Sequence, residues 1–296
     1  MAVWVIENEY LKASVNDSGA ELVSLVKKAT GENYMGGNDA RYWNRVSPVL
    51  FPFVGKVQDK TYRYAGVEYT GIPQHGFARD SVFALKEQQA DSILFELTPN
   101  ELFAGKYPFD FVLEIGYKLE KNVLTVSWNV KNNGDGPMYF SIGAHPAFRC
   151  PAPGTADDGM NGYAIDLHNG SDTLTSGTLN ADGTLTDEVR SFPMENGRLM
   201  LSDEVFARDA LVVDSSDIKK ASLIAPDGST YLEVGFDTPL LGLWSPAGKH
   251  APFLCIEPWY GRCDREGYNG TLEDREYGNE LEAGAEFEAS YTITVM

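Results

Sequence analysis

Two histidines and a glutamate lie in short phrases whose residue types suit proton transfer. His75 lies in PQHGFAR, His145 in GAHPAF and Glu257 in FLCIEPW. Histidine exchanges protons near neutral pH, and partial burial raises the pKa of a carboxylate toward the same range. A positioned acid and base of this kind are what general acid-base catalysis requires. These three side chains are therefore the candidate active site.

The neighbouring residues predict where the three side chains lie. The His75 phrase holds a proline and a glycine, which favour a loop beyond a strand end over a place inside a strand. His145 follows the apolar run 138–142 and precedes a proline, which indicates a strand exit. Glu257 follows the apolar run 253–256, which is typical of a buried strand, so its carboxylate needs solvent or a partner.

Each of these features also has a plainer interpretation. A surface histidine that caps a turn explains either histidine phrase taken alone. An ion pair with Arg262 or Arg79 would satisfy Glu257. The adjacent Trp259 offers either a flat face for the apolar side of a sugar or ordinary core packing. The occurrence of all three phrases in one chain favours the active site.

Alternation of apolar and polar residues with a period of two is the dominant pattern. Segments 111–119, 124–131 and 287–295 carry it most clearly, and each predicts a half-buried strand. Further short strands are expected near residues 3–15, 21–27, 93–97, 138–142, 210–214, 221–225, 231–236 and 253–257. Sustained helical periodicity is hard to find, so strands must pack on strands. We predict a mostly β fold, a large antiparallel β-sandwich, with residues 1–296 as a single domain.

The segment from Pro151 to Gly183 is rich in Gly, Asp, Asn and Thr. It is expected to be a long excursion that lies over the site.

Composition excludes several classes of function. Hydrophobic residues make up 43% and charged residues 23%, as in an ordinary globular protein. A net charge of -19 repels nucleic acid and anionic lipid surfaces, so neither is an expected partner. The stretch 41–80 nevertheless has more basic than acidic residues. It is either a solvated basic loop or a site for polar or anionic substrate groups.

Other motifs point to a cofactor-free protein of the cytoplasm. The 3 cysteines lack metal-type spacing and do not suggest a disulfide framework. No secretory signal or membrane-length apolar run is recognised, so a cytoplasmic protein is expected. Nucleotide-binding glycine motifs, a serine-hydrolase elbow and an EF-hand pattern are absent from the sequence.

The three phrases, in this order on a chain of this length and β character, resemble the aldose 1-epimerase (galactose mutarotase) family, especially its bacterial LacX-type branch. The resemblance extends from residues 16–22 through 107–109 to the C-terminal strand. It implies a galactose mutarotase-like β-sandwich and an isomerase of carbohydrate metabolism. It also implies a sugar substrate and no cofactor or metal.

The resemblance also implies roles for individual residues. Glu257 would take the proton of the C1 hydroxyl, His145 would protonate the ring oxygen, and His75 would bind the sugar near the reacting carbon. These transfers open the ring, and rotation followed by closure gives the other anomer. Substrate-binding roles extend to Arg79, Lys60, Asp209 and Trp259. Lys60 stands where galactose-specific members have an arginine, which argues against galactose specificity because the two side chains differ in hydrogen-bond geometry.

Alternative functions remain at this point. A hexose 6-phosphate would suit a pocket that Arg45, Lys60 and Arg79 surround, although the net charge of the whole chain favours a neutral aldose. A non-catalytic carbohydrate-binding or sugar-sensing protein would keep the fold without needing proton relays. Metal-dependent hydrolysis is weakly supported by two distant histidines and a glutamate. The chain is expected to be a monomer or homodimer.

Overall fold

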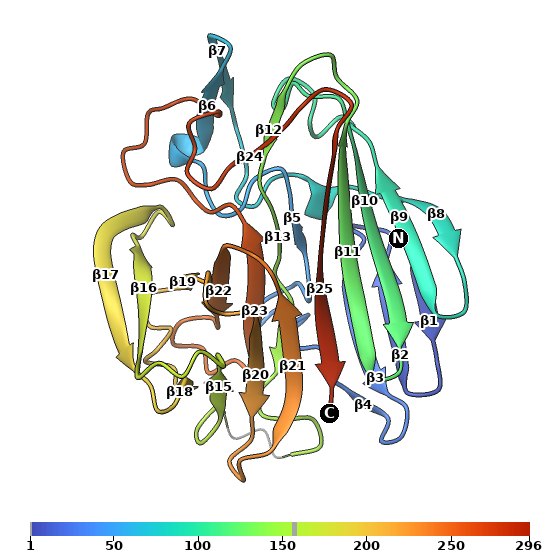
Figure 1. Ribbon diagram of the computed structural model, residues 1–296, viewed down its shortest axis with the longest axis vertical. Helices are drawn as coiled ribbons and strands as arrows, with labels where there is room; N and C mark the ends of the chain where they lie inside the picture. Colours follow the sequence, from blue (N-terminus) through green and yellow to red (C-terminus); the bar gives the residue numbers. More distant parts are fainter. Residues whose placement is uncertain (1, 156–158) are drawn as a thin grey trace.

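The computed structural model describes residues 2–155 and 159–296, and it is 49% strand and 2% helix. Two sheets dominate the fold (Figure 1). The nine-stranded sheet has the order β18 (Arg198–Met200), β15 (Ala164–Asp166), β20 (Lys220–Ile224), β21 (Thr230–Phe236), β25 (Glu286–Val295), β11 (Val123–Asn132), β10 (Phe111–Glu120), β9 (Ser92–Leu97) and β8 (Ala84–Gln88). The other has the order β17 (Leu185–Pro193), β16 (Thr173–Leu179), β19 (Leu211–Asp214), β22 (Leu240–Trp244), β23 (Phe253–Tyr260), β13 (Ile142–Ala144) and β5 (Val49–Leu50), with β14 (Ala147–Arg149) also paired to β23.

Smaller elements complete the chain. A four-stranded sheet has the order β1 (Val3–Glu7), β2 (Leu11–Asn16), β3 (Leu22–Lys27) and β4 (Glu32–Asn33). Two two-stranded sheets pair β6 (Thr61–Tyr64) with β7 (Val67–Thr70) and β12 (Met138–Phe140) with β24 (Asn279–Leu281). The helical turns in the described ranges are η1 (Gln58–Lys60) and η2 (Ala78–Asp80). The paired strands in the named ladders are antiparallel, which confirms the predicted antiparallel β-sandwich.

The core follows from the alternation in the sequence. Along β11 the apolar residues from Leu124 to Val130 are at most 3% exposed, whereas Ser127 and Lys131 between and after them face solvent. The same large core takes in Leu254 and Ile256 of β23, so it connects the two main sheets. Burial of such side chains stabilises the fold by about 25 cal/mol for each Å² of apolar surface removed from water.

Several predicted boundaries need correction. The segment 3–15 contains two strands, β1 and β2, and 138–142 divides into β12 and β13. The strand predicted at 253–257 continues to Tyr260, so Glu257 lies in mid-strand. The excursion 151–183 contains β15 and β16, although part of it, residues 156–158, lies outside the described residues.

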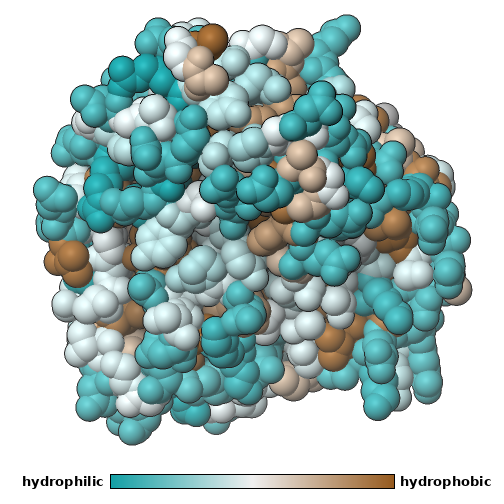
Figure 2. Space-filling model, turned by 45° about the horizontal axis from the view of Figure 1, so that its top comes forward, coloured by the Kyte–Doolittle hydropathy of each residue, from teal (hydrophilic) through white to brown (hydrophobic). Residues whose placement is uncertain are grey.

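The surface is largely polar on the face shown in Figure 2. The face in Figure 2 is mostly hydrophilic or intermediate in hydropathy, with hydrophobic residues in scattered small groups. Neither short helical turn in the described ranges approaches the length and apolar character of a membrane-crossing helix.

Candidate active site

A cavity of about 280 Å³ lies against the eight-stranded sheet. Its size falls at the small end of ordinary small-molecule sites, which are roughly 300–1,000 Å³. Strand residues and loop residues both contribute to its wall. The lining residues are Trp43, Val54, Gly55, Lys56, Gln74, His75, Arg79, His145, Leu179, Ala181, Gly183, Asp209, Ala210, Val212, Trp244, Glu257, Trp259 and Cys263.

Strand β23 brings Glu257 into this cavity by simple alternation. Leu254 and Ile256 belong to the main core, so Glu257 and Trp259 project from the opposite face of the strand. Trp259 lies across two glycines of neighbouring strands. A Cβ at Gly143 or Gly242 would approach the indole to 2.7 or 2.3 Å respectively. The two glycines therefore make room for the indole in the cavity wall.

His145 lies in the two-residue break between β13 and β14, as predicted for a strand exit. The Trp43 ring stacks on the imidazole at a centroid distance of 4.7 Å, and the Trp244 ring meets it edge-on at 5.4 Å. These two indoles fix the plane of the His145 ring.

His145 and Glu257 form a close buried pair. Nε2 of His145 lies 3.4 Å from Oε2 of Glu257, and the side chains are 10% and 1% exposed. Both carboxylate oxygens and Nδ1 of His145 lack a hydrogen-bond partner among the residues that the structure describes. The pair therefore has unused hydrogen-bonding capacity directed at a cavity, which is the arrangement expected where a polar ligand binds.

Burial dominates the pKa values of this pair. It raises the pKa of Glu257 well above the usual range, and the negative charge of Asp209 acts in the same direction. Trp259 lowers that pKa somewhat, although its indole N–H does not reach hydrogen-bond geometry. Burial lowers the pKa of His145 to about 3, with Arg79 adding to the shift. Both shifts favour the uncharged forms, a neutral imidazole and a protonated carboxyl group that holds the proton of the pair.

His75 is buried, which excludes the surface-turn interpretation for it. Its backbone has a φ of 66°, and its N–H donates to the carbonyl of Gly55 at 2.8 Å. The N–H of Gly55 donates in turn to Nδ1 of His75 at 3.1 Å, so a neutral ring carries its proton on Nε2. The ring centroid lies 5.5 Å from that of His145. Burial lowers the pKa of His75 well below its usual range, which favours this neutral form as a hydrogen-bond donor.

Arg79 lines the cavity near the histidines. Its Nη2 donates to the carbonyl of Gln74 at 2.7 Å, and burial lowers the pKa of the guanidinium to about 10. Arg45 lies outside the cavity lining; it donates to the carbonyl of Arg79 and pairs with Asp80 at 2.5 Å. Arg79 therefore reaches the cavity directly, whereas Arg45 does not.

Asp209 and Lys60 have different outcomes. Asp209 reaches the cavity from the loop before β19, in a backbone conformation with a φ of 69°. Lys60 is exposed and is not part of the cavity lining, whereas Lys56 of the same stretch is. Left-handed backbone at Asp59 and Lys60, with φ of 51° and 57°, turns the chain at this point.

The alternative interpretation of Glu257, an ion pair with Arg262 or Arg79, is not found in the described structure. Within the described chain, Arg262 pairs with Glu276 and Arg79 has Asp80 as its nearest acid. The ion-pair contact recorded for Glu257 is with His145.

Comparison with known proteins identifies the family of this chain. The sequence profile of the aldose 1-epimerase family matches residues 2–265. The chain belongs to the aldose 1-epimerase family. Membership supports an epimerase, a type of isomerase, with a sugar substrate.

This aldose 1-epimerase family member is similar to several known proteins, of which three are described. It is 30% identical to the plasmid protein LacX of Lactococcus lactis subsp. lactis, over 98% of each chain. The crystal structure of a galactose mutarotase related enzyme from Lactobacillus acidophilus is 33% identical, with a TM-score of 0.91 over 100% of this chain and 97% of that one. A putative glucose-6-phosphate 1-epimerase of Escherichia coli is 24% identical over 86% of this chain and 82% of its own.

Sequence reasoning missed several wall residues of this aldose 1-epimerase family member. Trp43 and Trp244 come from segments without a motif, Gln74 belongs to the His75 phrase but was given no role, and Lys56 lies in the basic stretch 41–80 without a motif of its own. The segment 179–183, at the end of the expected excursion, does contribute to the wall. Isolated tryptophans in polar loops and strand ends are the signal that could have identified the two indoles.

Proposed function

We propose that the protein is a cofactor-independent aldose 1-epimerase that interconverts the α and β anomers of a hexose. The observation that carries the proposal is the convergence of His145 and Glu257, 3.4 Å apart, with unpartnered polar atoms in a cavity of monosaccharide size. A binding module needs no such pair, since sugar hydroxyls are bound equally well by groups that do not exchange protons.

The proposed reaction needs one base and one acid. With a sugar bound, the proton of the pair resides on His145 and leaves Glu257 as a carboxylate. Glu257 then takes the proton of the C1 hydroxyl while His145 gives its proton to the ring oxygen, and the C1–O5 bond breaks to give the open aldehyde. Rotation about C1–C2 exposes the other carbonyl face, and ring closure reverses both transfers.

The other polar residues would bind and orient the sugar. The Nε2–H of His75 is directed to donate to an oxygen near the reacting carbon, and Asp209 and Arg79 offer hydrogen bonds to hydroxyls. Trp259 supplies an apolar surface for the C–H face of the ring. We assign the lysine contact to Lys56 in place of Lys60, because Lys56 lines the cavity.

A hexose 6-phosphate is the second candidate substrate. Lys56 and Arg79 in the wall favour it, as does the similarity to a putative glucose-6-phosphate 1-epimerase. We rank a neutral aldose first because the net charge of -19 opposes the approach of anions.

Polarimetry tests both candidates. Freshly dissolved α-glucose, α-galactose and glucose 6-phosphate are followed with wild type, with His145→Ala and without protein. Wild type should accelerate anomerisation of one of these sugars, and His145→Ala should lose roughly 100- to 10,000-fold of that rate. Wild-type rates at background for every sugar, or a His145→Ala rate equal to wild type, would contradict the proposed activity.

A further inference from the structure

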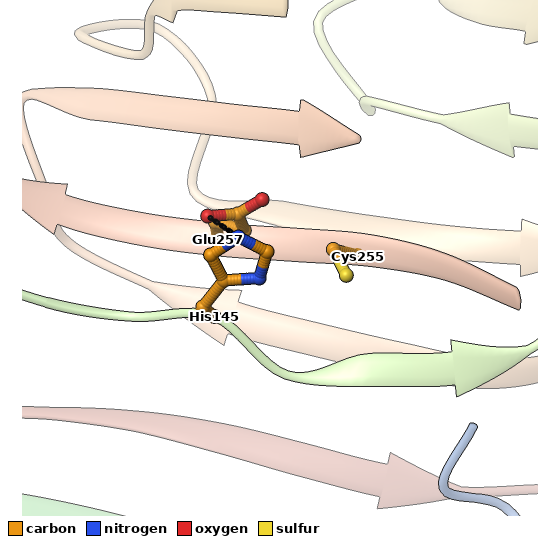
Figure 3. Close-up of side chains that lie close together, drawn as sticks. All are labelled: His145, Cys255 and Glu257. Carbon is orange, nitrogen blue, oxygen red and sulfur yellow. Dashed lines mark ion pairs between the residues drawn. The ribbon is translucent and has the colours of Figure 1, made fainter. Parts of the chain in front are cut away.

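A buried thiol lies beside the His145–Glu257 pair and has no part in the proposed reaction. Cys255 precedes Glu257 by two positions on β23, so both side chains project from one face of the strand. Figure 3 shows the sulfur of Cys255 on the same side of this strand as the His145 ring and the Glu257 carboxyl group. One ligand atom from each of these residues lies within 4.8 Å of the other two.

The three side chains have electron pairs that the protein leaves unused. Cys255 is a free, fully buried cysteine. Both oxygens of Glu257 lack hydrogen-bond partners among the described residues, and Nε2 of His145 faces one of them at 3.4 Å. Buried acceptors in this state are costly unless a cation or a donor reaches them. Since His145 and Glu257 line the cavity, an ion has a path to them from solvent.

The donor set selects the kind of ion. Sulfur, nitrogen and oxygen together suit Zn²⁺, whereas Mg²⁺ and Ca²⁺ prefer oxygen alone. Tetrahedral Zn²⁺ with bonds of about 2.0–2.3 Å holds its ligand atoms roughly 3.3–3.8 Å apart. The 3.4 Å between His145 and Glu257 already meets this spacing, and closure on sulfur needs a side-chain movement of about 1 Å. The cavity leaves the fourth position open to water.

We propose that Cys255, His145 and Glu257 form a Zn²⁺-binding site, and that Zn²⁺ bound there inhibits the enzyme. Binding releases the thiol proton of Cys255 and the proton of the His145–Glu257 pair to solvent. With their electron pairs donated to the metal, neither His145 nor Glu257 can exchange protons with a sugar. Only the inhibition rests on the proposed function; the binding site stands on the geometry.

The binding half of the proposal is tested without any sugar. Chelator-stripped wild type, Cys255→Ala and Cys150→Ala are titrated with Zn²⁺ by calorimetry and with Co²⁺ by absorption spectroscopy. Cys150 is the matched control, because it is also free and fully buried but does not belong to the cluster. Wild type and Cys150→Ala should bind one ion per chain and show a thiolate-to-cobalt charge-transfer band. Cys255→Ala should bind at least about tenfold more weakly and lose the band.

Two results would overturn the site. One is wild type without a cobalt–thiolate band, which needs no variant to fold. The other is a band that survives in Cys255→Ala or disappears in Cys150→Ala.

Inhibition is measured separately on the sugar that wild type anomerises. Zn²⁺ should lower the wild-type and Cys150→Ala rates at concentrations that match its binding, Mg²⁺ should not, and Cys255→Ala should need at least about tenfold more Zn²⁺. Zn²⁺ that binds without slowing the reaction would refute the inhibitory role. A lack of any anomerase activity would refute the proposed function and leave the binding result intact.

Discussion

Two clusters of buried ionisable side chains, His145–Glu257 at β23 and Asp264–Arg275 just beyond it, differ in how fully their polar atoms are hydrogen-bonded. Beyond the strand, Arg275 donates from Nε to Asp264 at 2.6 Å, and the other oxygen of Asp264 accepts from the Gln58 N–H at 2.8 Å. Within the strand, Glu257 is equally buried but both its oxygens lack such donors in the described structure. Both carboxylate oxygens of Asp264 accept hydrogen bonds, one of them from the loop that contains Lys56. The His145–Glu257 pair instead has polar atoms without hydrogen-bond partners in the described structure. This contrast is expected if the His145–Glu257 pair serves the proposed reaction and the Asp264–Arg275 pair serves stability.

The largest effect on stability is expected in the Asp264–Arg275 cluster. Arg275→Met leaves the buried carboxylate of Asp264 unpaired, and should lower the free energy of unfolding by about 3–5 kcal/mol in urea denaturation. Arg265→Met is the control, because Arg265 is 45% exposed and pairs with Glu276 at the surface. Its cost should stay within about 1 kcal/mol. Similar losses in the two variants would mean that burial of the Asp264–Arg275 pair has no special weight.

The pH dependence of stability should separate the two clusters further. The pKa of His145 falls from 6.5 to about 3 on folding, so the unfolded chain binds more protons between these values. Its contribution to stability is complete above pH 6.5 and is lost as the pH falls toward 3. The raised pKa of Glu257 acts in the opposite sense, with a contribution present below 4.5 and lost as the pH rises through the folded value.

Urea denaturation at pH 7 and pH 4 measures this dependence. Wild type should lose more stability on acidification than His145→Asn, whereas His250→Asn, at an exposed histidine, should lose about as much as wild type. Parallel losses in wild type and His145→Asn would contradict the buried neutral state of His145.

Asp209 offers a smaller test on the side of the reactive pair. Asp209→Asn removes a charged hydrogen-bond acceptor worth about 1.5–3 kcal/mol, so KM should rise roughly 10- to 100-fold with little change in stability. The acidic limb of the rate profile should also move to lower pH, because the charge of Asp209 helps to raise the pKa of Glu257. Asp214→Asn, at the exposed other end of β19, is the control. An unchanged KM in Asp209→Asn would remove Asp209 from the sugar site.

The smallest effect distinguishes two lysines of one loop. Lys56→Ala should raise KM about two- to fivefold, as expected for a partly exposed charge, and Lys60→Ala should leave KM within about twofold of wild type. Steady-state kinetics on the same sugar measure both. The reverse pattern would return the sugar contact to Lys60.

Local signals were sufficient to predict much of this molecule. Alternation along 111–131 predicted the long hairpin of β10 and β11. The apolar runs before His145 and Glu257 predicted the strand that ends just before His145 and the strand that contains Glu257. These patterns act over a few residues, where side-chain direction follows directly from strand geometry.

Other features depend on contacts between distant segments. Trp244 contacts His145 because β22 pairs with β23, and Trp43 contacts it because the loop before Val46 packs against the same ring. No local sequence pattern specifies either contact. The left-handed turn at Lys60 also could not be predicted by matching this stretch to a family motif. The turn changes the direction of the side chain without changing the sequence pattern. The space that Gly143 and Gly242 leave for the Trp259 indole likewise requires strand register.

Glu257→Gln tests the central claim most directly, because one variant reports on both catalysis and stability. The anomerisation rate and the free energy of unfolding at pH 7 are measured on the same preparation. The rate should fall roughly 100- to 10,000-fold, since glutamine cannot take a proton. The stability should be equal to or greater than that of wild type, since a buried acid whose oxygens lack hydrogen-bond donors in the described structure has been replaced by a neutral amide of the same shape. A rate within a few fold of wild type, or a stability loss like that of Arg275→Met, would contradict the account.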